Sequence, residues 1–339
     1  MKNIFTICLL LFSAPVFSEI LDSSAHYFQK GIEEKTARRF LVAAGYFDKA
    51  IHFNSNYTEA YIENGFVNKE MRRTDAAMQN FTKAYELDPG NDVVLKELAE
   101  LYYSYRQYQK AVDFAQKCKG CDNKERIIAM SYFGMEDYGK AEKILLELVA
   151  KNTNDAEVIY TLARTYLEMG LEGKAIPYFE KAIQADRTKS KWLFELGLMY
   201  YNNDNYKNAV VYFNKAAEQG FIRSNDFNEN LGFAYMYSRD FDNGEKLLSE
   251  IMARKPGDKE IIRDIALAFY DGKMYDKCLD YCQKLLEMDK NDGKALYQAG
   301  LCFQKKGQTQ RGQQMCDKAI EMDPSLNKLR QKNMTMGGL

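Results

Sequence analysis

The feature that most constrains this chain is internal repetition at an interval of 34 residues. Repeats begin at Ser24, Thr58, Asp92, Asp122, Ala156, Ser190, Asn225, Lys259 and Gly293. Successive starts lie 34 residues apart, except for 30 after Asp92 and 35 after Ser190. Such a period is typical of arrays whose units pack mainly on their neighbours, because one unit cannot bury its apolar side alone. We therefore expect one long array rather than a single globular core.

Each repeat carries a small residue at two fixed positions. The eighth position holds Gly31, Gly65, Ala99, Ala129, Ala163, Gly197, Gly232, Ala266 and Gly300. The twentieth holds Ala43, Ala77, Ala111, Ala141, Ala175, Ala209, Gly244, Cys278 and Gly312. Small side chains at both positions let two helices approach closely, so each repeat predicts a helical hairpin. Aromatic residues at the eleventh position, such as Tyr102 and Tyr200, are expected to fill the space between the helices.

This pattern resembles the tetratricopeptide repeat. The repeat that begins at Thr58 has, at the offsets of that family, Tyr61, Asn64, Gly65, Ala77, Phe81, Ala84 and Pro89. The resemblance implies an all-α fold, a right-handed α-solenoid of about nine helical hairpins over residues 24–326. Residues 19–23 would form a short N-terminal segment, and residues 327–339 a capping helix with a frayed tail. The resemblance is specific for the fold and says little about function.

Residues 1–18 have the composition of a signal peptide. A positive start at Lys2 precedes an apolar run over residues 4–12, and small or medium residues stand at Val16 and Ser18. This order predicts cleavage after Ser18, and the run is too short to span a bilayer, which takes about 20 residues. Cys8 lacks the small preceding residue of a lipidation site, so we expect a soluble exported protein. The periplasm of a Gram-negative bacterium is the expected location, with secretion as the alternative.

The resemblance also implies where a ligand would bind. In that family the first helix of each hairpin lines a concave groove with its positions 2, 5, 9, 12 and 13. In repeats 5 to 9 the candidate groove residues are Tyr160, Arg164, Phe194, Leu198, Tyr201, Phe233, Met236, Tyr237, Leu267, Tyr270, Tyr297 and Leu301. These residue types are enriched at binding surfaces, and a contiguous apolar patch usually marks a contact site.

Two interpretations of this aromatic stretch remain open. The first is a scaffold or adaptor that binds a protein or peptide segment in the groove. The second is that neighbouring side chains or the tail of the chain fill the groove. A different function is also open, that of a structural subunit of a cell-envelope assembly, which would contact partners through its convex face or its ends.

Cysteine spacing predicts one local disulfide. Cys118 and Cys121 lie where repeat 3 lacks four residues, and a bond between them would pinch the end of a shortened helix. A thiol–disulfide enzyme would need a βαβ context, which the sequence does not show. Cys278, Cys282 and Cys316 occupy core positions. The pair of Cys282 and Cys302 is the one long-range disulfide candidate.

Charge and composition argue against other classes of function. The chain has 47 basic and 48 acidic residues, so it has no basic footprint for nucleic acid. Only two histidines, His26 and His52, are available for acid–base or metal chemistry, and no glycine-rich phosphate loop occurs. We therefore expect no cofactor, no metal, no membrane span and no enzymatic activity.

Overall fold

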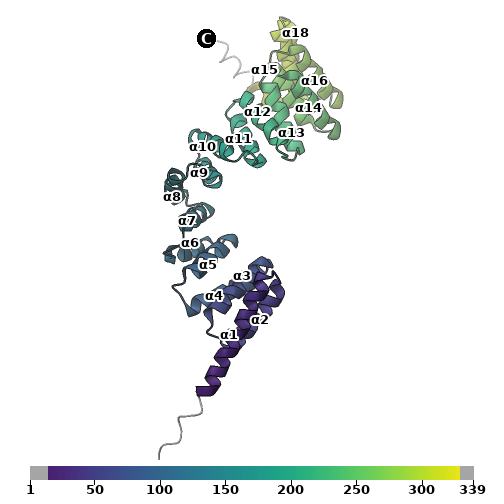
Figure 1. Cartoon of the computed structure of the whole chain (residues 1–339). Coiled ribbons are helices and arrows are strands. Elements are labelled where there is room, and N and C mark those ends of the chain that lie inside the picture. The colour runs from purple at the N-terminus through teal and green to yellow at the C-terminus, as the bar shows by residue number, and fades with distance from the viewer. Residues whose placement is uncertain (1–13, 329–339) are drawn as a thin grey trace, which may run out of the picture. The chain divides into compact units, whose positions relative to one another are not determined.

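The structure, a computed structural model, describes residues 14–328, with side chains from Ser23 onward. Every regular element in this range is helical, which confirms the all-α class (Figure 1). The chain divides into two compact units, with the boundary between Tyr178 and Phe179. We call the units unit 1 and unit 2 and describe each by itself.

Unit 1 contains nine helices and the start of a tenth: α1 (Ala14–Thr36), α2 (Phe40–Phe53), α3 (Thr58–Glu70), α4 (Thr74–Leu87), α5 (Asp92–Ser104), α6 (Tyr108–Lys117), α7 (Lys124–Gly134), α8 (Tyr138–Lys151), α9 (Ala156–Glu168) and α10 (Glu172–Ala185). Unit 2 contains the remainder of α10 and α11 (Ser190–Asn202), α12 (Tyr206–Glu218), α13 (Asn225–Tyr237), α14 (Phe241–Arg254), α15 (Lys259–Asp271), α16 (Tyr275–Met288), α17 (Gly293–Lys305), α18 (Thr309–Met322) and the 3₁₀ turn η1 (Pro324–Leu326). Inside each unit, an odd-numbered helix packs against the even-numbered helix that follows it. The chain is thus an α-solenoid of helical hairpins.

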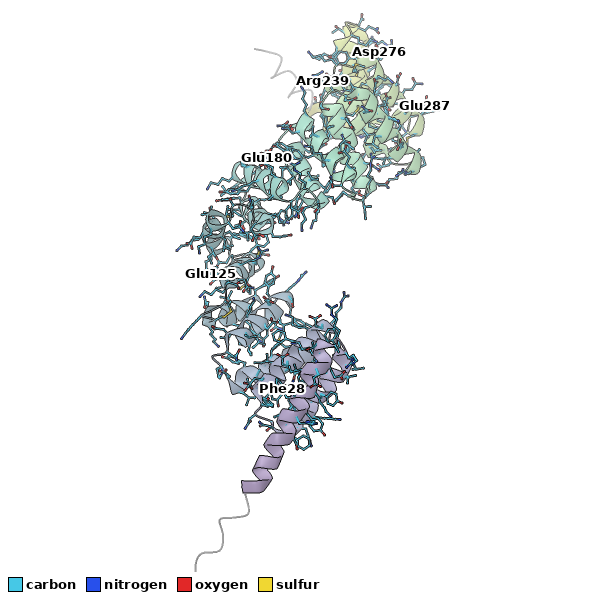
Figure 2. All side chains as sticks on the ribbon, viewed as in Figure 1. Phe28, Glu125, Glu180, Arg239, Asp276 and Glu287 are labelled. Carbon is cyan, nitrogen blue, oxygen red and sulfur yellow. A yellow bond between two sulfur atoms is a disulfide. The ribbon has the colours of Figure 1, made fainter. Side chains whose placement is uncertain are left out.

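Close approach of the paired helices depends on the small residue at the eighth position. A Cβ atom added to Gly31 would lie 2.5 Å from the ring of Phe47, and one added to Gly197 would lie 2.6 Å from Phe213. Both phenylalanines are fully buried. The space beside each of these two glycines is therefore filled by the phenylalanine at position 24 of the repeat. The small residue at position 20, which is expected from the sequence to face it, shares this space. Phe28, labelled in Figure 2, packs on the same core, with its ring 5.8 Å from that of Phe47.

The turn inside each hairpin has one conformation throughout. Its three residues place the middle one at positive φ, as at Arg38, Arg72, Arg106, Glu136, Gly170, Asp204, Arg239, Lys273 and Gly307. The residue after it donates its N–H to a carbonyl five positions back, from Arg39 to Glu34 at 2.9 Å and from Arg73 to Asn68 at 2.8 Å. This pattern is the Schellman motif, which satisfies the last carbonyls of the first helix.

Repeat 3 departs from the common length. Its second helix, α6, has 10 residues, whereas α4 and α8 have 14. A disulfide joins Cys118 and Cys121 directly after it, as their spacing predicts. The backbone N–H groups of Lys119 and Gly120 donate to the carboxylate of Asp92 at 3.0 and 2.8 Å. The short connection is thus held to the start of α5.

Seven odd-numbered helices begin at the residue where a repeat begins in the sequence; α1 and α7 differ. The helix α7 begins at Lys124 instead of Asp122, and α1 runs through the expected boundaries at Ser18 and Ser24, since no proline or glycine interrupts residues 16–30. Residues 1–13 of the predicted signal peptide and residues 329–339 of the predicted cap lie outside the described residues. Leu326 is buried against Tyr297 and Ala319 at the end of the array.

Candidate functional site

The first helices of unit 2 form a continuous surface. The contacts of α11 with α13, of α13 with α15 and of α15 with α17 bring every second helix side by side. Side chains at the outward positions of these helices can therefore act together on one ligand. Tyr160 and Arg164 belong to α9 of unit 1, where Arg164 bonds to Glu168 at 2.6 Å.

Three predicted groove residues belong to the core instead. Phe233, Met236 and Tyr297 are buried, with exposed fractions of 6%, 1% and 5%. Met236 lies in the space that the missing side chain of Gly244 leaves, since a Cβ atom there would be 2.7 Å from its Cγ. Tyr297 is covered by Leu326. These residues hold helices together and are not available to a ligand.

Phe194 is also engaged within the protein. Its ring stacks on Phe221 at 4.5 Å and lies 5.5 Å from Phe227 and 5.6 Å from Phe213. Self-packing, the second interpretation of the aromatic stretch, therefore holds at this position. Leu198 and Leu301 are half-buried, and Leu267 is exposed.

Five of the partly exposed tyrosines of unit 2 form a surface that we call the tyrosine face: Tyr201, Tyr206, Tyr237, Tyr270 and Tyr275. All five are half-buried. The ring of Tyr206 lies 5.4 Å from Tyr201 and 4.9 Å from Tyr237, and Tyr270 lies 5.6 Å from Tyr275. Tyr201, Tyr237, Tyr270 and Tyr275 pack on one shared core cluster. The face thus presents ring surfaces on a rigid support.

The sequence prediction missed Tyr206 and Tyr275, which begin the second helices α12 and α16. A signal for them exists. An aromatic residue at position 12 of a repeat contacts one at position 17 in four hairpins, joining Tyr103 to Tyr108, Phe133 to Tyr138, Tyr201 to Tyr206 and Tyr270 to Tyr275. The pairing crosses the hairpin turn, so a search restricted to first helices cannot find it.

Three carboxylates lie close to the tyrosine face. Burial, together with neighbouring acidic groups, raises the pKa of Glu229 and of Asp264 above the ordinary value, and burial raises the pKa of Asp271. Asp264 and Asp271 are nevertheless exposed, and Glu229 is half-buried. Water is therefore partly excluded around charges that a ligand can still reach.

The tyrosines respond to the same surroundings. Burial is the main cause that raises the pKa of Tyr201, and its neighbours Tyr237, Tyr206, Asp264 and Glu229 add to it. Burial raises the pKa of Tyr206 and of Tyr270 to about 12. The hydroxyls thus stay protonated at neutral pH and can donate hydrogen bonds.

One cavity borders the tyrosine face, and another lies beside Asp264. One, of about 450 Å³, is lined by Tyr206 and Tyr237 together with Asp204 and Arg239 at the hairpin turns. The other, of about 200 Å³, includes Asp264, Leu267, Gln298, Lys294 and Leu326 in its lining. Both are large enough for a single side chain of a partner.

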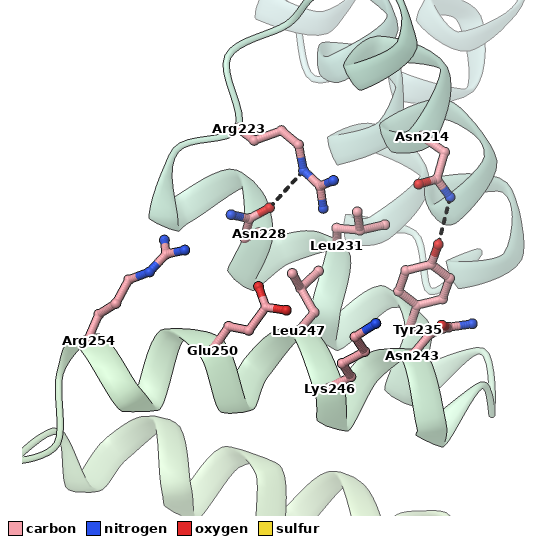
Figure 3. Close-up of a pocket in the computed structure, with 10 residues that line it drawn as sticks. All are labelled: Asn214, Arg223, Asn228, Leu231, Tyr235, Asn243, Lys246, Leu247, Glu250 and Arg254. Carbon is pink, nitrogen blue, oxygen red and sulfur yellow. Dashed lines mark hydrogen bonds between the residues drawn. The ribbon is translucent and has the colours of Figure 1, made fainter.

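A further cavity of about 500 Å³ lies elsewhere in unit 2, between α12, α13 and α14 (Figure 3). Arg223, Lys246 and Arg254 line it with Glu250. The Nε of Arg223 donates to Asn228 at 3.1 Å. This polar cavity shares no residue with the tyrosine face.

Within residues 14–328, the four cysteines outside repeat 3 are free thiols. Cys278, Cys282, Cys302 and Cys316 are free and buried, so the predicted disulfide between Cys282 and Cys302 is wrong. The sulfur of Cys282 lies 4.0 Å from that of Cys278 on the same helix. Among residues 14–328, no cluster of histidine, cysteine, aspartate or glutamate is placed to hold a metal ion. No helix of the same range has the length and apolarity to cross a bilayer.

Family models described as tetratricopeptide repeat match residues 70–126, 156–189, 192–219 and 293–326. Anaphase-promoting complex subunit 3 of Schizosaccharomyces pombe is 26% identical over 164 residues, which cover 47% of this chain and 25% of that protein. TPR repeat-containing protein YpiA of Bacillus subtilis is 24% identical over 233 residues, covering 65% and 53%. The chain thus matches between a quarter and about half of the length of these relatives.

Two solved structures overlap this chain at low similarity. The crystal structure of MamA protein is 18% identical and covers 50% of this chain and 95% of its own, with a TM-score of 0.45. The TPR domain of P58(IPK) is 14% identical and covers 93% and 99%, with a TM-score of 0.31. Likeness at this level supports no conclusion about this chain.

Proposed function

We propose that this member of the tetratricopeptide-repeat family is an exported scaffold, without catalytic activity, that binds a segment of a partner protein on the tyrosine face of unit 2. Arrays of this family bind protein partners through the surfaces of their stacked helices. The proposal is narrower than the groove predicted over repeats 5 to 9, because Phe194, Phe233, Met236 and Tyr297 are engaged within unit 2.

The observation that carries the proposal is the half-burial of the five tyrosines. Within the described part of the chain, no group accepts a hydrogen bond from the hydroxyl of Tyr201, Tyr237 or Tyr270. Such side chains offer a rigid apolar ring and a free polar end, and they lose little conformational entropy on binding. A partner segment with apolar anchors and backbone carbonyls can use both.

Affinity capture from envelope extract, with the full mature chain as bait, tests the proposal. The bait variant Tyr201→Ala with Tyr206→Ala should lose the partner. Tyr103→Ala with Tyr108→Ala is the matched control, because it removes the equivalent aromatic pair from repeat 3 of unit 1. Circular dichroism must show that both variants stay helical. A partner that binds all three baits equally would contradict binding on the tyrosine face.

Export has its own support and its own test. The basic, apolar and small-residue order of residues 1–18 is that of a signal peptide, and a disulfide is typical of oxidising compartments. We expect the mature protein to begin at Glu19. Mass spectrometry of the protein purified from the envelope fraction measures this, and an intact N-terminus at Met1 in that fraction would contradict it.

A second candidate function is the structural subunit, which contacts partners outside the tyrosine face. One observation favours it: Ile222, in the linker between α12 and α13, exposes 83% of its side chain. The variant Ile222→Ser should abolish capture in this case, while the tyrosine variants retain it.

A further inference from the structure

In the part of the chain that the structure describes, the three carboxylates beside the tyrosine face, Glu229, Asp264 and Asp271, lack the charged partners that Asp292 and Glu245 of unit 2 have. Asp292 receives two bonds from Arg263, at 3.2 and 3.1 Å, and Glu245 pairs with Lys277 at 3.0 Å. Within the described residues, by contrast, no side chain forms an ion pair or a hydrogen bond with the carboxylate of Glu229, Asp264 or Asp271. Uncompensated charges in a partly dry surrounding are costly, and a cation from outside would relieve that cost.

The surrounding groups leave this negative charge in excess. Three further carboxylates stand near Glu229 and Asp264: Asp226, Asp258 and Glu260. A fourth, Asp204, accepts a hydrogen bond from Tyr206 at 2.6 Å. The nearby cations are Lys255, Arg263, Lys294, Lys207 and Arg239. Arg263 is already bound to Asp292, and Arg239 donates to the carbonyl of Gly272 at 3.3 Å. Lys255 and Lys294 form no ion pair with the three carboxylates in the described residues.

The rings of the tyrosine face also differ from those of five other tyrosines in the array. Lysines of the protein stand over these five rings: Lys110 over Tyr102, Lys140 over Tyr132, Lys174 over Tyr166, Lys215 over Tyr212 and Lys284 over Tyr281, at 4.2 to 5.2 Å. Within residues 14–328, no lysine or arginine stands over a ring of the tyrosine face. The negative faces of these five rings remain available to a cation.

We propose that the segment bound on the tyrosine face is rich in arginine or lysine, with cationic groups placed over the rings and paired with Glu229, Asp264 and Asp271. This inference rests on the proposed function and names the chemical class of its partner. Arginine suits the site best, since its planar guanidinium stacks on aromatic rings and bonds to carboxylates at once. Acidic segments would be repelled, and purely apolar ones would bury the carboxylates without compensation.

The experiment measures binding of two short fluorescent peptides by anisotropy. One contains arginine, serine and leucine, and the other has glutamine in place of every arginine. The wild-type mature chain should bind the arginine peptide at least about tenfold more tightly at low salt. The variant Glu229→Gln with Asp264→Asn should lose most of this preference, since it removes two charges with little change in shape.

A matched control separates the site from net charge. The variant Asp242→Asn with Glu218→Gln removes the same charge at two exposed residues of unit 2 outside the face, and it should keep the preference within about twofold. Equal binding of both peptides by the wild type, or equal losses in both variants, would overturn the proposal.

Two further outcomes decide between related ideas. If a captured partner needs Tyr201 and Tyr206 but binds Glu229→Gln with Asp264→Asn normally, the proposed function stands and the cationic class is wrong. If the arginine peptide binds only after Lys328, Arg330 and Lys332 are replaced by glutamine, the basic tail of the chain occupies the face. That result would overturn a free site for an external cationic segment.

Discussion

At the scale of the residue, the middle position of each hairpin turn is under backbone constraint. Seven of these residues are not glycine although their φ lies between 56° and 72°. A left-handed conformation costs an L-residue about 1–2 kcal/mol. The Schellman bonds around the turn offset this cost at each hairpin.

We predict that Gly307→Ala destabilises the protein by about 1 kcal/mol. Gly307 has φ 84°, and an added Cβ atom would meet no other atom within 4 Å, so the effect reports backbone conformation alone. Gly45→Ala is the control. Gly45 lies inside α2 with equal space around it, and the change should stabilise by about 0.5–1 kcal/mol. Urea denaturation followed by circular dichroism measures both, and shifts of the same sign would contradict the prediction.

The raised pKa of the carboxylates predicts a pH dependence of binding. Burial favours the protonated forms of Glu229 and Asp264 in the free protein, whereas a bound cation favours the ionised forms. Affinity for the arginine peptide should therefore rise with pH just above the ordinary carboxyl range of about 4. Anisotropy titrations from acid to neutral pH measure it. Glu229→Gln with Asp264→Asn should flatten the profile, and an unchanged profile in that variant would contradict the assignment.

The raised carboxylate pKa values have the opposite effect on stability: binding rises with pH, whereas the free energy of unfolding falls. A folded-state pKa above the unfolded value means that the folded chain binds more protons between the two values, so the free energy of unfolding falls as pH rises through that interval. Asp264→Asn should thus raise the melting temperature at neutral pH and not below the ordinary carboxyl range.

Individual side chains limited how much of the site could be predicted. Repeat position predicted that the groove residues face solvent. Tyr201, Tyr237 and Tyr270 do reach the surface, whereas Phe233 and Met236 are buried. The difference lies in the neighbours, since Gly244 leaves room that Met236 fills. Whether Met236 is buried thus depends on a residue of the second helix of its hairpin. The spacing of residues along the first helix alone cannot predict it.

At the scale of the element, helix positions followed from local pattern. Small residues at fixed spacing and turn residues between them define each hairpin, so the helices and the shortening of α6 could be predicted. The start of α1 could not, because the expected boundaries at Ser18 and Ser24 rest on processing and on repeat phase rather than on a helix-stop signal. The free thiols of Cys282 and Cys302 show that sequence position also fails to predict a disulfide between two different helices.

We predict that the disulfide stabilises the end of α6. Cys118→Ser with Cys121→Ser should lower the stability of unit 1 by about 2 kcal/mol. Without the bond the unfolded chain gains conformational entropy, and the gain is small because the closed loop is short. Hydrogen exchange should rise most over residues 114–121. A reductant should reproduce the effect in the wild type and change nothing in the double variant. Equal exchange in oxidised and reduced protein would contradict a stabilising role.

At the scale of the whole molecule, a repeat array responds locally, because each hairpin contacts mainly its neighbours. A partner on the tyrosine face should therefore protect the amides of α11, α13 and α15 and leave those of α1 to α8 unchanged. At a partner concentration about a hundredfold above Kd, the stabilisation of the bound region amounts to about 2.7 kcal/mol. Hydrogen exchange with mass spectrometry measures this, and protection confined to unit 1 would contradict the site.

The lysines that stand over Tyr102, Tyr132, Tyr166, Tyr212 and Tyr281 have a consequence for selectivity. An incoming guanidinium must compete there with an ammonium group that is tethered a few bonds away, at an effective concentration no free ligand reaches. Those rings are thus protected from stray cations by prior occupancy. The array can therefore carry these five tyrosines without offering their rings to a partner, since its own lysines already cover them.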